Sequence, residues 1–194
     1  MGEPGEVGVS VPGEGHVGPG TVSEVLALPE DAGNRIELVG ALWWSVPVPA
    51  SPTSAPPRRL AALLRAAGGA SGQPLEVLEA VNMVIPGGML IPDIGVADAD
   101  ATAAAVLSID AHDVVLVMEI ALPSTRVTGR EMEPALYAAA GIPHYWRLEL
   151  VPAARLYCGT RHGSSGYMDR ALTAGQSTEL SVPLPVALDP AHLL

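Results

Sequence analysis

The chain alternates short apolar runs with breaks rich in Gly and Pro, a pattern typical of strands and short helices. The run from Asp113 to Leu122 is almost continuously aliphatic over residues 114–118 and predicts a strand buried on both faces. One acid, Glu119, lies within this run. Because an unpartnered desolvated carboxylate is costly, Glu119 either ends the strand with its head in water or faces a cleft that holds a metal ion or substrate.

The N-terminal segment differs from the rest of the chain. Residues 1–20 are rich in Gly and Pro without any sustained period, and we expect a flexible tail. Thr21 and Glu24 have the spacing of a capping box, which predicts a short helix after Thr21. We therefore divide the chain into a tail, residues 1–20, and one domain, residues 21–194.

Two further elements are predicted before residue 70. Apolar residues on both sides of Gly40 predict a strand pair over residues 35–48. After a loop with five prolines, residues 58–67 have strong helix propensity. The pair Gly68-Gly69 is expected to stop that helix.

The middle of the chain predicts a hairpin. Residues 75–85 form one expected strand, residues 86–88 (Pro-Gly-Gly) the turn, and residues 89–97 the returning strand. Asp93 follows a proline within the returning strand. An acid is thereby predicted next to the buried strand that contains Glu119.

The C-terminal third predicts one helix and several strands. A helix that begins near Glu133, with Pro134 in its first turn, is the cleanest interpretation of residues 130–140. Strands are expected over residues 142–151, 155–160, 167–172 and 177–182. Strand pairs followed by strand–helix–strand indicate an α+β fold with a mixed sheet and additional C-terminal antiparallel strands.

Composition narrows the possible functions. All ten basic residues are Arg, so no lysine is available as a base or Schiff-base former. The net charge of −11 argues against non-specific nucleic-acid affinity, which depends on basic surfaces. The single cysteine, Cys158, excludes an internal disulfide and is expected to be a small core residue. With no signal peptide and no apolar run near the ~20 residues of a membrane span, we expect a cytoplasmic protein.

Three acids on three predicted strands are candidates for one site: Glu37, Asp93 and Glu119. Hard divalent cations such as Mg²⁺ bind a few carboxylates together with water and substrate oxygens. For Glu37 the alternative is the solvent face of a half-buried strand. A Pro-Asp followed by an acid that closes a hydrophobic strand is also the pattern of the PD-(D/E)XK nuclease superfamily.

Flanking segments sharpen this likeness, and residues 21–194 resemble the Uma-two family of restriction-endonuclease-like proteins. The resemblance rests on Leu28-Pro-Glu-Asp31, Arg35-Ile-Glu-Leu-Val39, Pro92-Asp93, Glu119-Ile-Ala-Leu-Pro-Ser-Thr125 and Tyr137-Ala-Ala-Ala-Gly-Ile-Pro-His-Tyr-Trp146. It implies a restriction-endonuclease-like mixed β-sheet core flanked by helices, Mg²⁺ or Mn²⁺ dependence, a DNA substrate and a homodimer. It also implies that Asp93 and Glu119 bind the metal, with Glu37 as an accessory acid.

The chain lacks the lysine that the family pattern contains. The superfamily lysine two residues after the glutamate is replaced by Ala121, and the lysine that the family places on the following helix corresponds to Glu133. Losing such an electrostatic stabiliser costs on the order of 10²–10³ in rate. Arg130, three residues before Glu133, is a candidate substitute for the charge but not for a base. Glu133 is alternatively a further metal ligand.

Two functions follow. The first is a metal-dependent endonuclease with a degenerate active site. The second is a catalytically inactive nuclease-like scaffold that acts with a protein partner in assembly or regulation. For the scaffold, Trp43-Trp44 on a strand at the sheet edge is a candidate interface, with core packing as the alternative.

Overall fold

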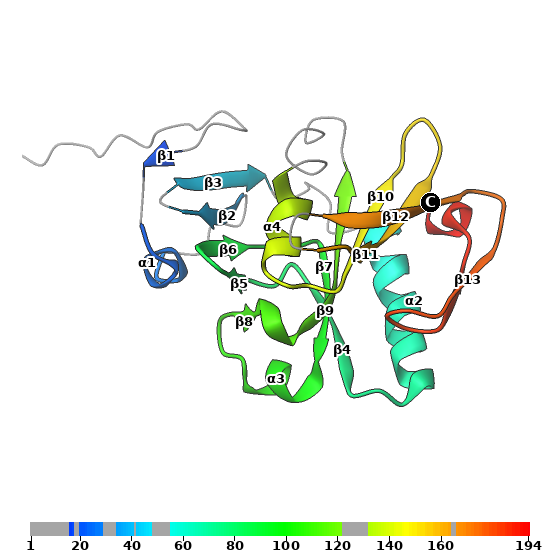
Figure 1. Cartoon of the computed structure of the whole chain (residues 1–194), viewed down its shortest axis with the longest axis horizontal. Helices are drawn as coiled ribbons and strands as arrows, with labels where there is room; N and C mark the ends of the chain where they lie inside the picture. The colour runs from blue at the N-terminus through cyan, green and yellow to red at the C-terminus, as the bar shows by residue number, and fades with distance from the viewer. Residues whose placement is uncertain are drawn as a thin grey trace, which may run out of the picture.

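The computed structural model describes residues 16–17, 20–28, 34–40, 42–47, 55–121, 132–163 and 166–194. Most strands of this part of the chain belong to two six-stranded sheets, A and B (Figure 1). Sheet A consists, in spatial order, of β1 (His16–Val17), β3 (Leu42–Pro47), β2 (Asn34–Val39), β6 (Gly88–Leu90), β5 (Met83–Ile85) and β8 (Ile109–Asp110).

Sheet B is the central sheet of the molecule. Its spatial order is β12 (Tyr167–Thr173), β11 (Arg155–Arg161), β10 (His144–Glu149), β9 (Val114–Ala121), β7 (Ile94–Asp98) and β4 (Leu75–Glu79). Strands β9 and β10 are parallel, whereas the other neighbouring strands are antiparallel. A separate ribbon pairs β13 (Thr178–Leu180) with β14 (Val186–Leu188). The predicted mixed sheet with extra C-terminal antiparallel strands is therefore confirmed.

Helices cover both faces of sheet B. The structure contains α1 (Val22–Leu26), α2 (Ala55–Ser71), α3 (Ala99–Ala104) and α4 (Glu133–Ala139), with 3-10 turns η1 (Ala111–Asp113) and η4 (Pro190–Leu193). Helix α2 packs through Leu60 and Leu64 on the face that carries Leu116 and Met118. On the opposite face, Tyr137 of α4 packs in a second cluster that includes Val117 and Tyr145.

Several local predictions agree with the structure. The Thr21 hydroxyl accepts a hydrogen bond from the Glu24 amide and donates one to the Glu24 carboxylate, so this residue pair caps α1 at the predicted position. The strand pair β2–β3 turns at Gly40, whose φ of 63° favours glycine. Helix α4 begins at Glu133 with Pro134 in its first turn, as expected.

The predicted end of α2 is wrong. The helix continues through Gly68 and Gly69 to Ser71, and the residue that leaves it with a positive φ of 68° is Gly72. A helix-ending glycine is selected by that left-handed conformation, which Gly68 and Gly69 do not adopt. Ala67 is buried against the core of sheet B, so tertiary packing favours continuation.

The predicted hairpin of two long strands is also more divided than expected. Ala80, with φ of 53°, breaks the first strand, so that β4 joins sheet B and β5 joins sheet A. The returning strand divides in the same way into β6 and β7, with Asp93 between them. The Ala80 amide donates to the Asp93 carbonyl oxygen at 3.2 Å, which fixes the crossing point. Asp93 thus lies where the chain passes from one sheet to the other.

Some predictions fall outside the described residues. These include most of the tail, residues 1–20, of which His16–Val17 pair with β3. They also include Arg130 and the Pro-Ser-Thr segment after β9. Among the described helices, none is long and apolar enough to cross a membrane.

Candidate functional site

Glu37 reaches the site from sheet A. It lies on β2, which pairs with β6 through Leu38 and Val39. This approach is close, because a Cβ atom at Gly88 would overlap the carbonyl oxygen of Leu38. The Glu37 Oε1 atom accepts a hydrogen bond from the Ile91 amide at 2.8 Å. The carboxylate is therefore directed to the segment that contains Asp93.

Asp93 is held from two sides. Its Oδ2 atom accepts a hydrogen bond from the Ile120 amide at 2.9 Å, next to Glu119 on β9. Its Oδ1 atom lies 3.1 Å from the Arg35 guanidinium, and both side chains of this pair are about one-fifth exposed. Asp93 consequently connects β2 of sheet A with β9 of sheet B.

Glu119 and Glu133 complete the cluster. The Tyr137 hydroxyl donates a hydrogen bond to Glu119 Oε1 at 2.6 Å. Tyr137 is fully buried, and its ring stacks on Tyr145 with 5.8 Å between centroids. Glu133 is the first residue of α4, one turn before Tyr137, so both side chains lie on the helix face directed at Glu119.

Burial and mutual repulsion perturb these acids. Burial raises the pKa of Glu37 to about 7, although the Ile91 amide and the Arg35 guanidinium lower it. The pKa of Glu133 rises to about 8, mainly through burial and then through the charges of Glu37 and Asp93. Acids from two sheets and a helix therefore repel one another at one place.

Glu119 is the most strongly affected member. Burial raises its pKa well above the ordinary value, and the charges of Glu133 and Asp93 raise it further. The hydrogen bond from Tyr137 opposes this rise without cancelling it. Ionisation of these acids would place an excess of negative charge here, which a bound cation would offset.

Of the predicted site residues, Glu37, Asp93, Glu119 and Glu133 are brought together, whereas Arg130 lies outside the described residues. Sequence reasoning missed two members, Arg35 and Tyr137. Arg35 is two positions before Glu37, so the strand period places both side chains on one face. Tyr137 follows Glu133 by four residues, which is the helical spacing. Both signals were present in the sequence.

The cluster has the donor chemistry that a hard divalent cation requires, since its ligands are carboxylate oxygens. A buried polar atom without a partner lies beside it, because the indole Nε1 of Trp44 has no hydrogen-bond acceptor in the described part of the chain. Trp44 pairs directly with Glu37, so the two side chains share a face of the sheet. The carboxylates are therefore suited to a divalent cation, and the Trp44 indole N–H to a polar atom of a ligand beside it.

The carboxylate oxygens of the acid cluster lie farther apart than the ligand atoms of a single bound ion would. Among the described residues, three ligand atoms within 4.8 Å of one another occur only at Asp110, His112 and Asp113. Asp110 and His112 are exposed there, and that group contains none of the four clustered acids. Binding one ion at the cluster would require its carboxylates to close on the ion.

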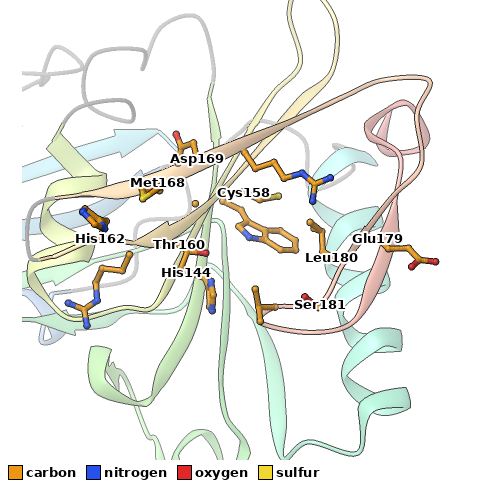
Figure 2. Close-up of a pocket in the computed structure, with 14 residues that line it drawn as sticks. His144, Cys158, Thr160, His162, Met168, Asp169, Glu179, Leu180 and Ser181 are labelled. Carbon is orange, nitrogen blue, oxygen red and sulfur yellow. The ribbon is translucent and has the colours of Figure 1, made fainter.

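A hollow of about 540 Å³ lies elsewhere, on the α2 face of sheet B near β10, β11 and β12 (Figure 2). Figure 2 shows His144 and Thr160 opposite Leu180 and Ser181, with Glu179 directed away. Glu37, Asp93, Glu119 and Glu133 do not line it. Burial raises the pKa of Cys158 in its wall to about 12, so this thiol is no nucleophile near neutral pH. The hollow and the acid cluster therefore lie on opposite faces of sheet B.

Trp43 and Trp44 have different environments. Trp43 packs against the small core of Val25, Leu38 and Met89. Core packing, one of the two interpretations of this pair, therefore describes Trp43.

The fold and the acids together define a protein of the restriction-endonuclease-like class: a mixed sheet flanked by helices, with clustered acids on one face. The family model described as "Putative restriction endonuclease", Uma2, matches residues 22–189, and the chain belongs to this family. No curated protein matches the sequence. The structure is similar to the crystal structure of "a putative nuclease belonging to DUF820" from Anabaena variabilis. The TM-score is 0.63 at 15% identity, over 85% of this chain and 90% of that chain.

Proposed function

We propose that the chain is a metal-dependent endonuclease that hydrolyses phosphodiester bonds of nucleic acid, with DNA as the expected substrate. The observation that carries this proposal is the convergence of four acids where sheets A and B meet: the Ile91 amide holds Glu37, the Ile120 amide holds Asp93, and the pKa values of Glu37, Glu119 and Glu133 are raised by burial and by neighbouring carboxylates. Family membership supports a nuclease. In the reaction a water oxygen bonds to phosphorus, the bond to the leaving oxygen breaks, and the proton released by water balances the alkoxide.

Asp93 and Glu119 would hold Mg²⁺ or Mn²⁺, with Glu37 as an accessory ligand and Glu133 as a further acid. A bound divalent cation would polarise the phosphoryl group and lower the pKa of its water. The chain's own contribution is to orient the acids: the Ile91 amide orients Glu37 and the Tyr137 hydroxyl orients Glu119. Burial of Glu133 and Glu37 keeps protons available to leave as a cation binds.

The test is Mn²⁺- or Mg²⁺-dependent cleavage of plasmid DNA and of RNA by the wild-type protein and by Asp93→Asn. We expect cleavage by the wild type and a loss of at least about a hundredfold in the variant. The matched control is Asp110→Asn, which removes an exposed acid outside the cluster and should leave the rate unchanged. Absence of cleavage over a broad substrate panel, or equal cleavage by Asp93→Asn, would contradict the proposal.

A second candidate function is a nuclease-like scaffold without catalysis that binds a protein partner. It is favoured by specific observations: the chain has no lysine, an acid, Glu133, occupies the position of the family lysine, and the net charge is −11. Calorimetry with Mn²⁺ separates the two functions. Binding that is abolished in Asp93→Ala/Glu119→Ala supports the nuclease, whereas no binding by the wild type supports the scaffold. The homodimer stays a prediction that sedimentation can check.

A further inference from the structure

The acid cluster contains a cation, Arg35, that sequence reasoning did not assign to the site. Of the ion pairs formed by the described residues, only Arg35 with Asp93 involves a cluster acid. The positive charge of Arg35 also lowers the pKa of Glu37, two residues further along β2. Arg35 therefore lies between two of the acids, on the same strand face as Glu37.

Two other arginines of the described residues, Arg65 and Arg147, form ion pairs away from the cluster. Arg65 pairs with Glu79 at 2.8 Å, with both side chains well exposed. Arg147 pairs with Glu149 at 3.2 Å and stacks over the Tyr157 ring. Neither is recorded as acting on the charge of a cluster acid. Arg35 is thus the arginine with direct access to the cluster.

The guanidinium has donors left for a ligand. An arginine carries five N–H donors, and among the described residues the guanidinium makes one hydrogen bond, from an Nη atom to Asp93 Oδ1. The side chain is 20% exposed, so it is reachable from solvent. The other oxygen of Asp93 is already fixed by the Ile120 amide. Asp93 can therefore keep its orientation while Arg35 binds a second anion.

We propose that Arg35 is the phosphate-binding cation of this site, in place of the absent lysine. Its free N–H groups donate to a non-bridging oxygen of the scissile phosphate, and its charge offsets the charge that develops there during hydrolysis. Arg35 accepts and releases no proton, because guanidinium stays charged in proteins. This inference rests on the proposed nuclease function and names the group that holds its substrate.

The experiment compares Arg35→Met, Arg35→Lys and the matched surface control Arg65→Met. With Mn²⁺, Arg35→Met should lower kcat by about 10²–10³-fold, whereas Arg65→Met should not change it. Arg35→Lys should recover at least tenfold over Arg35→Met, because it restores the charge without the planar fork. Calorimetric Mn²⁺ affinity of Arg35→Met should be unchanged or tighter, since a positive charge near the ion is removed.

This affinity separates a phosphate contact from a structural role. If Arg35 merely held Asp93, Mn²⁺ affinity and kcat would fall together in Arg35→Met, and the inference would be overturned. A kcat within threefold of wild type would also overturn it, while the nuclease proposal would stand.

Binding provides a readout that does not depend on cleavage. Fluorescence anisotropy of a labelled duplex in Ca²⁺ should show at least about tenfold weaker affinity for Arg35→Met and no change for Arg65→Met. If the wild type binds DNA through Arg35 but cleaves nothing, hydrolysis is refuted and the phosphate contact is supported. If wild type and Arg35→Met bind equally, or neither binds, the phosphate contact is refuted.

Discussion

The two faces of sheet B differ in what they hold. One face carries Glu119 and packs against α4, and its neighbours are acids with strongly perturbed pKa values. The other face carries Leu116 and Met118 under α2 and ends in the hollow beside β11. The face with the hollow lacks the four clustered acids, and the acid face has the convergent polar groups. Chemistry, rather than volume, therefore identifies the candidate site.

The largest expected effect is the loss of stability when an apolar side chain of the α2 face is removed. Leu64 is fully buried between α2 and sheet B, so Leu64→Ala should lower the free energy of unfolding by about 2–5 kcal/mol. The control Leu107→Ala removes a side chain that is 61% exposed and should change stability by less than about 0.5 kcal/mol. Urea denaturation measures both values. Equal effects of the two substitutions would contradict the assignment of the α2 face as the main core.

On the acid face, substitution should raise the free energy of unfolding rather than lower it. The raised pKa of Glu133 means that its contribution to stability is present below pH 4.5 and is lost as pH rises through about 8. Without metal, Glu133→Gln should therefore be more stable than wild type at pH 8.5, by on the order of 1 kcal/mol or more, and similar at pH 5. Denaturation at both pH values, in a chelator, measures this difference.

The control for that measurement is Glu179→Gln, which changes an exposed acid on the opposite side of the sheet. It should give no pH-dependent gain of stability. A gain for Glu133→Gln of the same size at pH 5 and pH 8.5 would mean that charge repulsion is not its cause.

The smallest effect is expected in α2. A Cβ atom at Gly69 meets nothing within 4 Å, and the residue lies inside the helix. Gly69→Ala should raise the free energy of unfolding by about 0.5–1 kcal/mol, because alanine restricts the unfolded chain and favours helix. Gly72→Ala is the informative control, since φ of 68° disfavours alanine and should make that variant less stable. Destabilisation by Gly69→Ala would argue that the helix ends before residue 69.

The features that sequence patterns predicted correctly are those that depend on residues close together in the chain. The N-terminal cap of α1, the turn at Gly40 and the start of α4 depend on neighbouring residues and were predicted correctly. The division of strands between two sheets was not, because it depends on a left-handed alanine, Ala80, that no propensity indicates. Four acids were predicted at one site: Glu37, Asp93 and Glu119 are brought together by the strand order, and Glu133 by the start of α4.

The cation was harder to find. Motif reasoning placed it after Glu119 or near Glu133, at positions where the family has lysine. Arg35 is distant in sequence from both and reaches Asp93 across the junction of the two sheets. Only the pairing of β2 with β6 brings it there. That long-range pairing has no signature in a single sequence, although the two-residue spacing between Arg35 and Glu37 did indicate that both side chains share one strand face.

The anchors of two acids are main-chain groups. The Ile91 amide donates to Glu37 and the Ile120 amide donates to Asp93, which also pairs with Arg35, so side-chain substitution at Ile91 or Ile120 leaves the main-chain donor in place. Only proline would delete it. The orientation of these two acids is thereby insulated from sequence drift along the strands that support them. Substitutions can therefore change the cation or the apolar face in the course of evolution while the main-chain amides keep Glu37 and Asp93 oriented.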